Sequence, residues 1–407
     1  MDEYFKSYII NDNLLYKANV VFNNKNKIFN SKIIIYPNTK KLLSYKLFWC
    51  KNNKILNSYT AIKSFNKRCN NHFEIKLNNC LAMPKYANGL CLIVNDNKYY
   101  FNITSDIIKR KTSKLLFEFA AFSDFHIESF TENIEHVKHL KSAFKAIKNK
   151  EKNCKFIISI GDQTNHGKQE NYDCLNKIIK DENTLNIPIY FALGNHEYIY
   201  NKTYEESINR YFNNLNVKDV YYSFIYNDCK FIFLGSDSIV GEGTINDNHI
   251  NWLINELNNT NKNMPTFIFI HQPFYNTISG SLKGQNWHGI DSGVKIKKLL
   301  DKYQNVFVFS GHTHWTLNSY KSILKKKNVT YINCASIGYL WNDDDRFIKG
   351  SEGLFVKIYE NYVSVNGYEF TLNKRIGAAK FLIPLKKWYT ISGDEICYQY
   401  LMIFIIT

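Results

Sequence analysis

One pattern constrains the fold of the second part of this chain more than any other: short apolar runs that end directly in polar residues. These runs have the length and composition of buried strands and lie at residues 115–122, 156–160, 189–193, 266–270 and 306–310. Helical spacing at residues 133–148, and a further helix that ends near residue 178, separate the first three. Strands that alternate with helices predict an α/β domain, in which ligands collect at the carboxyl ends of the strands.

The part of the chain before residue 113 has a different character. Short segments rich in Ile, Val, Tyr and Phe alternate with Asn, Lys and Gly turns, at residues 31–36, 42–49, 72–77, 89–94 and 98–103. Evenly spaced short strands without helical periodicity predict a small all-β sandwich of the fibronectin or Ig-like type. A length of 407 residues suits two domains, and we place them at residues 1–112 and 113–407.

The composition excludes some classes of function. The formal net charge is +16, but the lysines are spread along the whole chain with no dense basic helix or arm, so we do not expect nucleic-acid binding. No apolar run is long enough to span a membrane, and the apolar tail at 401–406 is expected to be a buried strand or a frayed end.

The cysteines and the N-terminus bear on the compartment. The chain has nine cysteines without a C-x-x-C pair, and no signal peptide is visible at its start. We therefore expect a reduced, cytoplasmic protein, with secretion left open, in which cysteines such as Cys154, Cys174, Cys229 and Cys334 are small buried apolar residues.

The polar clusters at the strand ends contain the candidate functional residues. In chain order they are Asp124-x-His126, Gly161-Asp162, Gly194-Asn195-His196-Glu197, His271 and Gly311-His312-x-His314. Carboxylates, imidazoles and an amide without thiols form a ligand set that suits Mn, Fe or Zn better than a thiolate-bound structural zinc.

Each cluster alone is weak evidence. Asp124 and His126 could serve as a helix cap or a surface loop, and a lone histidine after a strand, such as His271, is more often structural. Two residues that are two positions apart beyond a strand can point to one side, so Asp124 and His126 could reach one ion. The two histidines of the last cluster, His312 and His314, form a metal-chelating pair at a strand end. A glycine before Asp162 permits a sharp turn, and a carboxylate has two oxygens with which it could bridge two metal ions.

Taken together, the order D-x-H, G-D, G-N-H-E, H and G-H-x-H resembles the calcineurin-like metallophosphoesterase superfamily. The segments Gly161–Gly167 and Ser310–His314 resemble its bacterial cyclic-nucleotide-phosphodiesterase-like branch. The resemblance implies a four-layer α/β/β/α sandwich with the site at the strand ends. A β-sandwich before the catalytic domain also resembles the purple acid phosphatases.

The resemblance further implies a role for each residue. Asp124, His126 and His314 would hold one metal ion, and Asn195, His271 and His312 would hold the other. Asp162 would bridge the two ions and take part in catalysis. His196 would contact the phosphate or protonate the leaving oxygen, while the metal ions activate a water that attacks phosphorus.

Two departures separate this chain from better-known branches. Serine/threonine protein phosphatases have Asp-Arg-Gly where this chain has Asn165-His166-Gly167, which leaves an Asp–His dyad and an arginine clamp in doubt. Purple acid phosphatases have Tyr at the position of Asn165 and Gly at that of His126. We retain Asn165, His166 and His288 as candidate substrate-binding residues.

The aromatic residues after the last motif, Trp315 and those at 339–341, could line the substrate site or pack in the core or on the surface. The acidic run at 343–345 is expected to be a solvated loop.

The leading hypothesis is a phosphoesterase that acts on a small phosphorylated substrate. The alternatives are a protein that binds metal or phosphate without turnover, and an adhesion or glycan-binding module that carries the esterase.

Overall fold

The computed structural model describes residues 3–23, 32–68, 71–77, 81–84, 86–102, 113–200, 203–236, 243–285, 287, 289–290 and 293–386. His288 and the apolar tail at 401–406 lie outside these residues. No helix in the described ranges is long and apolar enough to cross a membrane.

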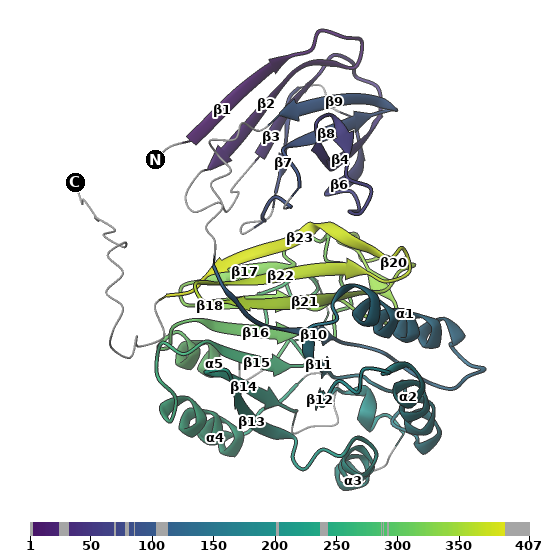
Figure 1. Cartoon of the computed structure of the whole chain (residues 1–407), viewed down its shortest axis with the longest axis vertical. Coiled ribbons are helices and arrows are strands. Elements are labelled where there is room, and N and C mark those ends of the chain that lie inside the picture. The colour runs from purple at the N-terminus through teal and green to yellow at the C-terminus, as the bar shows by residue number, and fades with distance from the viewer. Residues whose placement is uncertain are drawn as a thin grey trace.

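Two antiparallel sheets form the N-terminal part of the chain (Figure 1). The first has the order β1-β2-β3-β7, with strands Glu3–Ile9, Leu15–Asn23, Lys32–Pro37 and Phe73–Lys76. The second has the order β5-β4-β8-β9, with β6 also paired to β4; these strands are Lys54–Ile55, Leu43–Lys51, Gly89–Val94, Asn97–Asn102 and Lys63–Lys67. Aromatic contacts such as Tyr45 with Phe73 join the sheets face to face, as the strand pattern predicts for a sandwich.

The remainder of the chain is built on two mixed sheets of six strands each. The first has the order β12-β11-β10-β21-β22-β23, with strands Ile189–Ala192, Cys154–Ile160, Leu115–Phe122, Glu352–Tyr359, Tyr362–Glu369 and Lys374–Pro384. The second has the order β13-β14-β15-β16-β18-β17, with strands Tyr221–Tyr226, Cys229–Leu234, Thr266–Ile270, Val306–Ser310, Val329–Asn333 and Ile323–Lys326. A short hairpin of β19 (Leu340–Trp341) and β20 (Phe347–Ile348) stands apart from both.

Phenylalanine rings fill the space between the two sheets. Phe119 of β10 lies 5.6 Å from Phe231 of β14 and 5.8 Å from Phe267 of β15, measured between ring centroids. All three side chains are fully buried. Strands buried on both faces explain why the apolar runs are continuous rather than alternating.

Helices cover the outer face of each sheet (Figure 1). The first sheet is covered by α1 (Ile134–Lys150), α2 (Gln169–Glu182) and α3 (Tyr204–Leu215), and the second by α4 (Asp247–Asn258) and α5 (Gly293–Leu300). The helical spacing correctly predicts the buried face of α1, except that Ile134 is 47% exposed at the first turn. The predicted four-layer α/β/β/α sandwich after an all-β segment is confirmed.

The N-terminal sheets are joined to the outer strand β23 by hydrogen bonds. Trp49 Nε1 donates to the Gly377 carbonyl at 2.9 Å, and Thr60 N donates to the Arg375 carbonyl at 2.9 Å. A β-bridge pairs Leu81 with Phe381. These hydrogen bonds continue the edge of the first sheet into the N-terminal part, so that edge is covered rather than free for other chains.

Candidate metal centre

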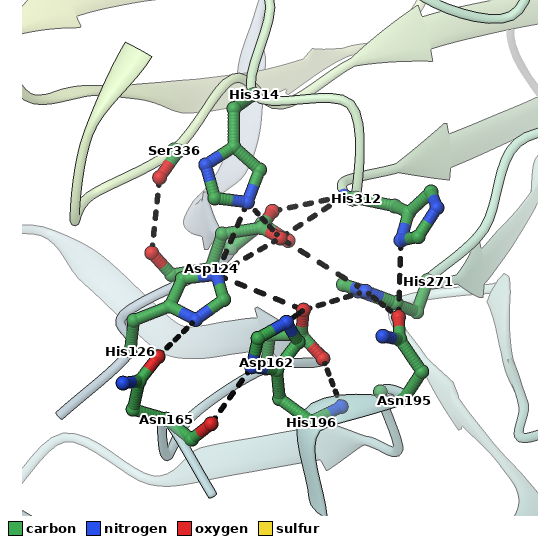
Figure 2. Close-up of polar contacts among 12 residues, drawn as sticks. Asp124, His126, Asp162, Asn165, Asn195, His196, His271, His312, His314 and Ser336 are labelled. Carbon is green, nitrogen blue, oxygen red and sulfur yellow. Dashed lines mark hydrogen bonds and ion pairs between the residues drawn. The ribbon is translucent and has the colours of Figure 1, made fainter. Parts of the chain in front are cut away.

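The predicted strand ends meet at one place because the strands that carry them are parallel neighbours. In the first sheet β10 runs parallel to β11, and β11 to β12; in the second, β15 runs parallel to β16. The backbone pairing continues past the strands, since Asp124 N donates to the Gly161 carbonyl at 3.1 Å and Gly311 N to the His271 carbonyl at 3.0 Å. The polar clusters thereby lie side by side, as Figure 2 shows.

Several of these residues hold a left-handed backbone that non-glycine residues rarely adopt. The φ angles are 56° at Asp124, 47° at His126, 52° at Asp162, 66° at His312 and 56° at His314. Each residue in this conformation costs on the order of 1–3 kcal/mol and persists only where the surrounding structure enforces it. Strain of this kind is concentrated at functional sites. The turns direct the side chains toward a common centre instead of along the sheet.

Two groups of side chains could each hold a metal ion, and they share Asp162. The first group is Asp124, His126, Asp162 and His314, and the second is Asp162, His271 and His312; within each group the ligand atoms lie within 4.8 Å of one another.

Individual contacts show how tightly these groups converge. His314 Nε2 lies 3.0 Å from Asp124 Oδ1 in the first group, and His271 Nε2 lies 3.1 Å from Asp162 Oδ2 in the second. The Asn195 amide oxygen adjoins the second group, at 3.1 Å from His271 Nε2 and 3.0 Å from His312 Nδ1. All seven residues that the sequence marks as metal ligands are therefore brought together.

Backbone carbonyls orient two of the histidines. His271 Nδ1 lies 2.8 Å from the Ile160 carbonyl, and His314 Nδ1 lies 3.1 Å from the Tyr339 carbonyl. A carbonyl only accepts, so Nδ1 carries the proton and Nε2 points into the cluster. This arrangement fixes the ring and the tautomer that a metal ligand needs.

His126 is oriented by a side-chain relay instead. Its Nδ1 lies 3.2 Å from Asn165 Oδ1, and Asn165 Nδ2 donates to Glu128 Oε2 at 3.3 Å. The Asn165 amide thus lies between an imidazole of the cluster and a carboxylate (Figure 2 shows the Asn165–His126 contact). The Asn165 side chain therefore positions His126 and is not directed at a substrate.

The protonation states suit cation binding. Burial acts to raise the pKa values of Asp124 and Asp162, but the surrounding histidines outweigh it and hold both well below the usual range. Burial lowers the pKa of His126 to about 4 and that of His312 to about 3, which keeps both rings neutral. At His271 burial is outweighed by Asp162 and Asp124, which raise its pKa to about 10. Ionised buried carboxylates beside the neutral rings of His126 and His312 form a donor set that fits divalent cations, and His271 would release its Nε2 proton when a cation binds.

A comparison with known families agrees with this geometry. Residues 117–316, which contain every residue of the cluster, match the sequence profile of the calcineurin-like phosphoesterases. This domain belongs to the calcineurin-like metallophosphoesterase superfamily. The chain is accordingly a phosphoesterase hydrolase with a buried Asp/His metal-binding cluster.

One solved structure in the comparison resembles the chain in fold. A purple acid phosphatase from seeds of yellow lupin (Lupinus luteus) is 10% identical with a TM-score of 0.50, over 87% of this chain and 72% of that one. A structure of PhoD is 10% identical with a TM-score of 0.42, over 89% of this chain and 90% of that one. No curated protein matches the chain in sequence.

Glu197 supports the metallophosphoesterase cluster through hydrogen bonds to the backbone, a role that the sequence did not reveal. Its fully buried carboxylate accepts hydrogen bonds from three backbone amides: Asp162 N at 3.1 Å, Gly194 N at 3.0 Å and Thr164 N at 3.1 Å. Burial and the nearby Asp162 carboxylate raise the pKa of Glu197 to about 7. The side chain joins the loop after β11 to the loop after β12, and both loops carry cluster residues.

The remaining candidate residues lie around this core. His196 is held by its Nδ1, 2.8 Å from the Asn165 carbonyl, and its Nε2 lies 3.9 Å from Asp162 Oδ2 with 27% of the side chain exposed. His166 lies next to Glu128, with 3.5 Å between His166 Nδ1 and Glu128 Oε1. His288 lies outside the described residues.

Aromatic rings adjoin the cluster on one side. Tyr339 lies 4.2 Å from His314 and 5.4 Å from His126 between ring centroids, and Trp287 lies 6.1 Å from His314 and 6.3 Å from His312. Trp315, which the sequence left open as a wall of the site, is fully buried. His136 of α1, which the sequence did not single out, stacks on Tyr339 at 5.8 Å.

Proposed function

We propose that this chain hydrolyses a phosphomonoester or phosphodiester with the help of two divalent or trivalent metal ions. The observation that carries the proposal is the shared position of Asp162, whose carboxylate belongs to both groups of potential ligands. A carboxylate has two oxygens, so it can hold two ions at the short spacing that two-metal hydrolases use.

In this proposal Asp124, His126 and His314 hold one ion, while Asn195, His271 and His312 hold the other. The ligand atoms are nitrogen and oxygen only, which favours Mn, Fe or Zn. When bound, the ions would supply positive charge to the phosphate and lower the pKa of an attacking water.

His196 is proposed to act on the leaving group. Its Nδ1 is engaged by the Asn165 carbonyl, so the Nε2 atom is the one that faces the cluster, and part of the ring remains exposed. A ring held in this way can donate a proton from Nε2 to the leaving oxygen as the bond to phosphorus breaks. In this proposal the Asn165 backbone carbonyl orients His196, whereas serine/threonine protein phosphatases have an Asp at the position of Asn165 for this purpose.

The substrate is proposed to be a small phosphorylated molecule. We infer that the chain is nearest to the cyclic-nucleotide-phosphodiesterase-like branch, because it has Asn165-His166 in place of Asp-Arg and retains His126. The hydrogen bond between Asn165 and His126 supports this inference, since both distinguishing residues act together.

A substrate screen tests the proposal. Purified protein is loaded in turn with Mn, Fe, Zn and Mg and assayed on aryl phosphomonoesters and phosphodiesters. We expect turnover with at least one metal, and loss of that turnover in Asp162→Ala because both ligand groups lose a member. A metal-loaded protein that binds phosphate but cleaves no ester would instead indicate a binding protein without turnover.

A further inference from the structure

We propose that the substrate carries a planar aromatic group, which rests on a platform formed by Trp287, Tyr339 and Trp341. This inference rests on the proposed hydrolysis, because it places the phosphate at the metal cluster. It adds the chemical class of the organic part of the ester.

The platform adjoins the cluster directly. Tyr339 packs 4.2 Å from the His314 ring, and Trp287 lies within 6.3 Å of both His312 and His314, measured between centroids. Trp341 follows in the same layer, since its backbone N donates to the His314 carbonyl at 2.9 Å and its ring lies 5.5 Å from Trp287. A phosphate on the cluster therefore has its ester substituent within reach of these rings.

The three rings are half-buried rather than packed into the core. Trp315, which meets Trp287 edge-on at 5.5 Å between centroids, is fully buried and belongs to the core. The outer edge of the same layer continues to Phe347, which lies 6.2 Å from Tyr339 and is 56% exposed. A run of aromatic rings that stays partly open next to a catalytic cluster is costly to leave in water unless a ligand covers it.

The ring faces of the platform favour a planar group over an aliphatic chain. Trp287 Nε1 donates to Asp345 Oδ1 at 3.4 Å and Trp341 Nε1 is buried, so neither indole N–H is presented to a substrate and the rings themselves would make the contact. Indole and phenol faces also attract planar rings by offset or edge contacts that an alkyl group cannot make.

Two phosphonates of similar size and charge isolate the aromatic contribution. Phenylphosphonate and cyclohexylphosphonate both resist hydrolysis, so binding to Mn-loaded protein is measured by isothermal titration without turnover. We expect phenylphosphonate to bind about three-fold to ten-fold more tightly. That ratio should fall toward one in Trp287→Ala and persist in Trp287→Phe.

A matched control and a separate assay complete the test. Trp252 of α4 is also half-buried but packs on Tyr221 in the other helical layer, so Trp252→Ala should leave the ratio unchanged. Equal affinities for the two phosphonates in the wild type, or a ratio that Trp287→Ala does not alter, overturns the inference. Turnover of a generic phosphoester is measured in parallel: its absence refutes the proposed hydrolysis, while turnover without an aryl preference refutes only the platform.

Discussion

Gly161, immediately before Asp162, is a position where a single added methyl group should disrupt the cluster. Its φ of +83° is left-handed, and a Cβ built there would lie 2.3 Å from His271 Nδ1. That contact is far below van der Waals distance, and it falls on the atom that bonds the Ile160 carbonyl at 2.8 Å. Gly161→Ala must therefore both strain the turn and displace His271.

The size of the effect follows from these two parts. A left-handed alanine costs about 1–2 kcal/mol. Displacing His271 breaks the buried hydrogen bond from its Nδ1 to the Ile160 carbonyl, which keeps its bond from Ser123 Oγ, and leaves the His271 donor unpaired; this adds about 1–3 kcal/mol. We expect the free energy of unfolding of the metal-free protein to fall by about 2–5 kcal/mol in total.

Gly284 provides a matched control, because its φ is +90° and a Cβ there would meet nothing within 4 Å. Gly284→Ala should cost only the conformational part, about 1–2 kcal/mol. Urea denaturation measures both variants, and calorimetry measures Mn²⁺ binding, which should weaken about ten-fold or more in Gly161→Ala alone. If the two variants lose equal stability and bind Mn²⁺ equally, the proposed packing of His271 against Gly161 is refuted.

Three further substitutions test the surroundings of the cluster. Glu197→Gln turns an amide NH₂ toward backbone donors, so urea denaturation at pH 8 should show that the free energy of unfolding falls by about 1–3 kcal/mol. An unchanged free energy of unfolding would mean that the Glu197 carboxylate does not support the two loops. Glu128→Gln weakens the hydrogen-bond relay to His126, so Mn²⁺ calorimetry should show about a ten-fold loss of affinity for one of the two ions. An equal loss of affinity for both ions would contradict the proposed role of the relay. Burial raises the pKa of Glu352 from 4.5 to about 7, with Glu369 contributing. Protonated Glu352 therefore stabilises the fold fully below pH 4.5, and this stabilisation is lost as pH rises through 7. Between about pH 4 and pH 8 the free energy of unfolding of the wild type should fall by about 3 kcal/mol relative to that of Glu352→Gln. Urea denaturation at each pH measures this difference.

The strand ends were predictable from the sequence because a strand that is buried on both faces has a continuous run of apolar residues. Residues 156–160 and 266–270 are of this kind, and each stops where the polar cluster begins. Residue types then sufficed to name Asp162 and His271 as candidate ligands. Strands β1 and β2 were missed, since lysines and asparagines interrupt their apolar positions and a strand of a sandwich needs only one buried face.

Other features depend on contacts that no local pattern encodes. Glu197 binds the amide of Thr164, and Trp49 binds the carbonyl of Gly377, across separations of 33 and 328 residues. The left-handed turn at His126 also escapes sequence reasoning, because that conformation is uncommon for any non-glycine residue, even for histidine, in which it is enriched. The structure likewise reveals that the Asn165 side chain holds His126, a pairing that neither motif suggests alone.

The central claim, that two metal ions share Asp162, is tested most directly by titrating metal-free protein with Mn²⁺ while following phosphoester hydrolysis. The account predicts that activity rises until about two ions are bound per chain and then stays constant. Full activity with one ion per chain, or activity that is independent of added metal, would contradict it.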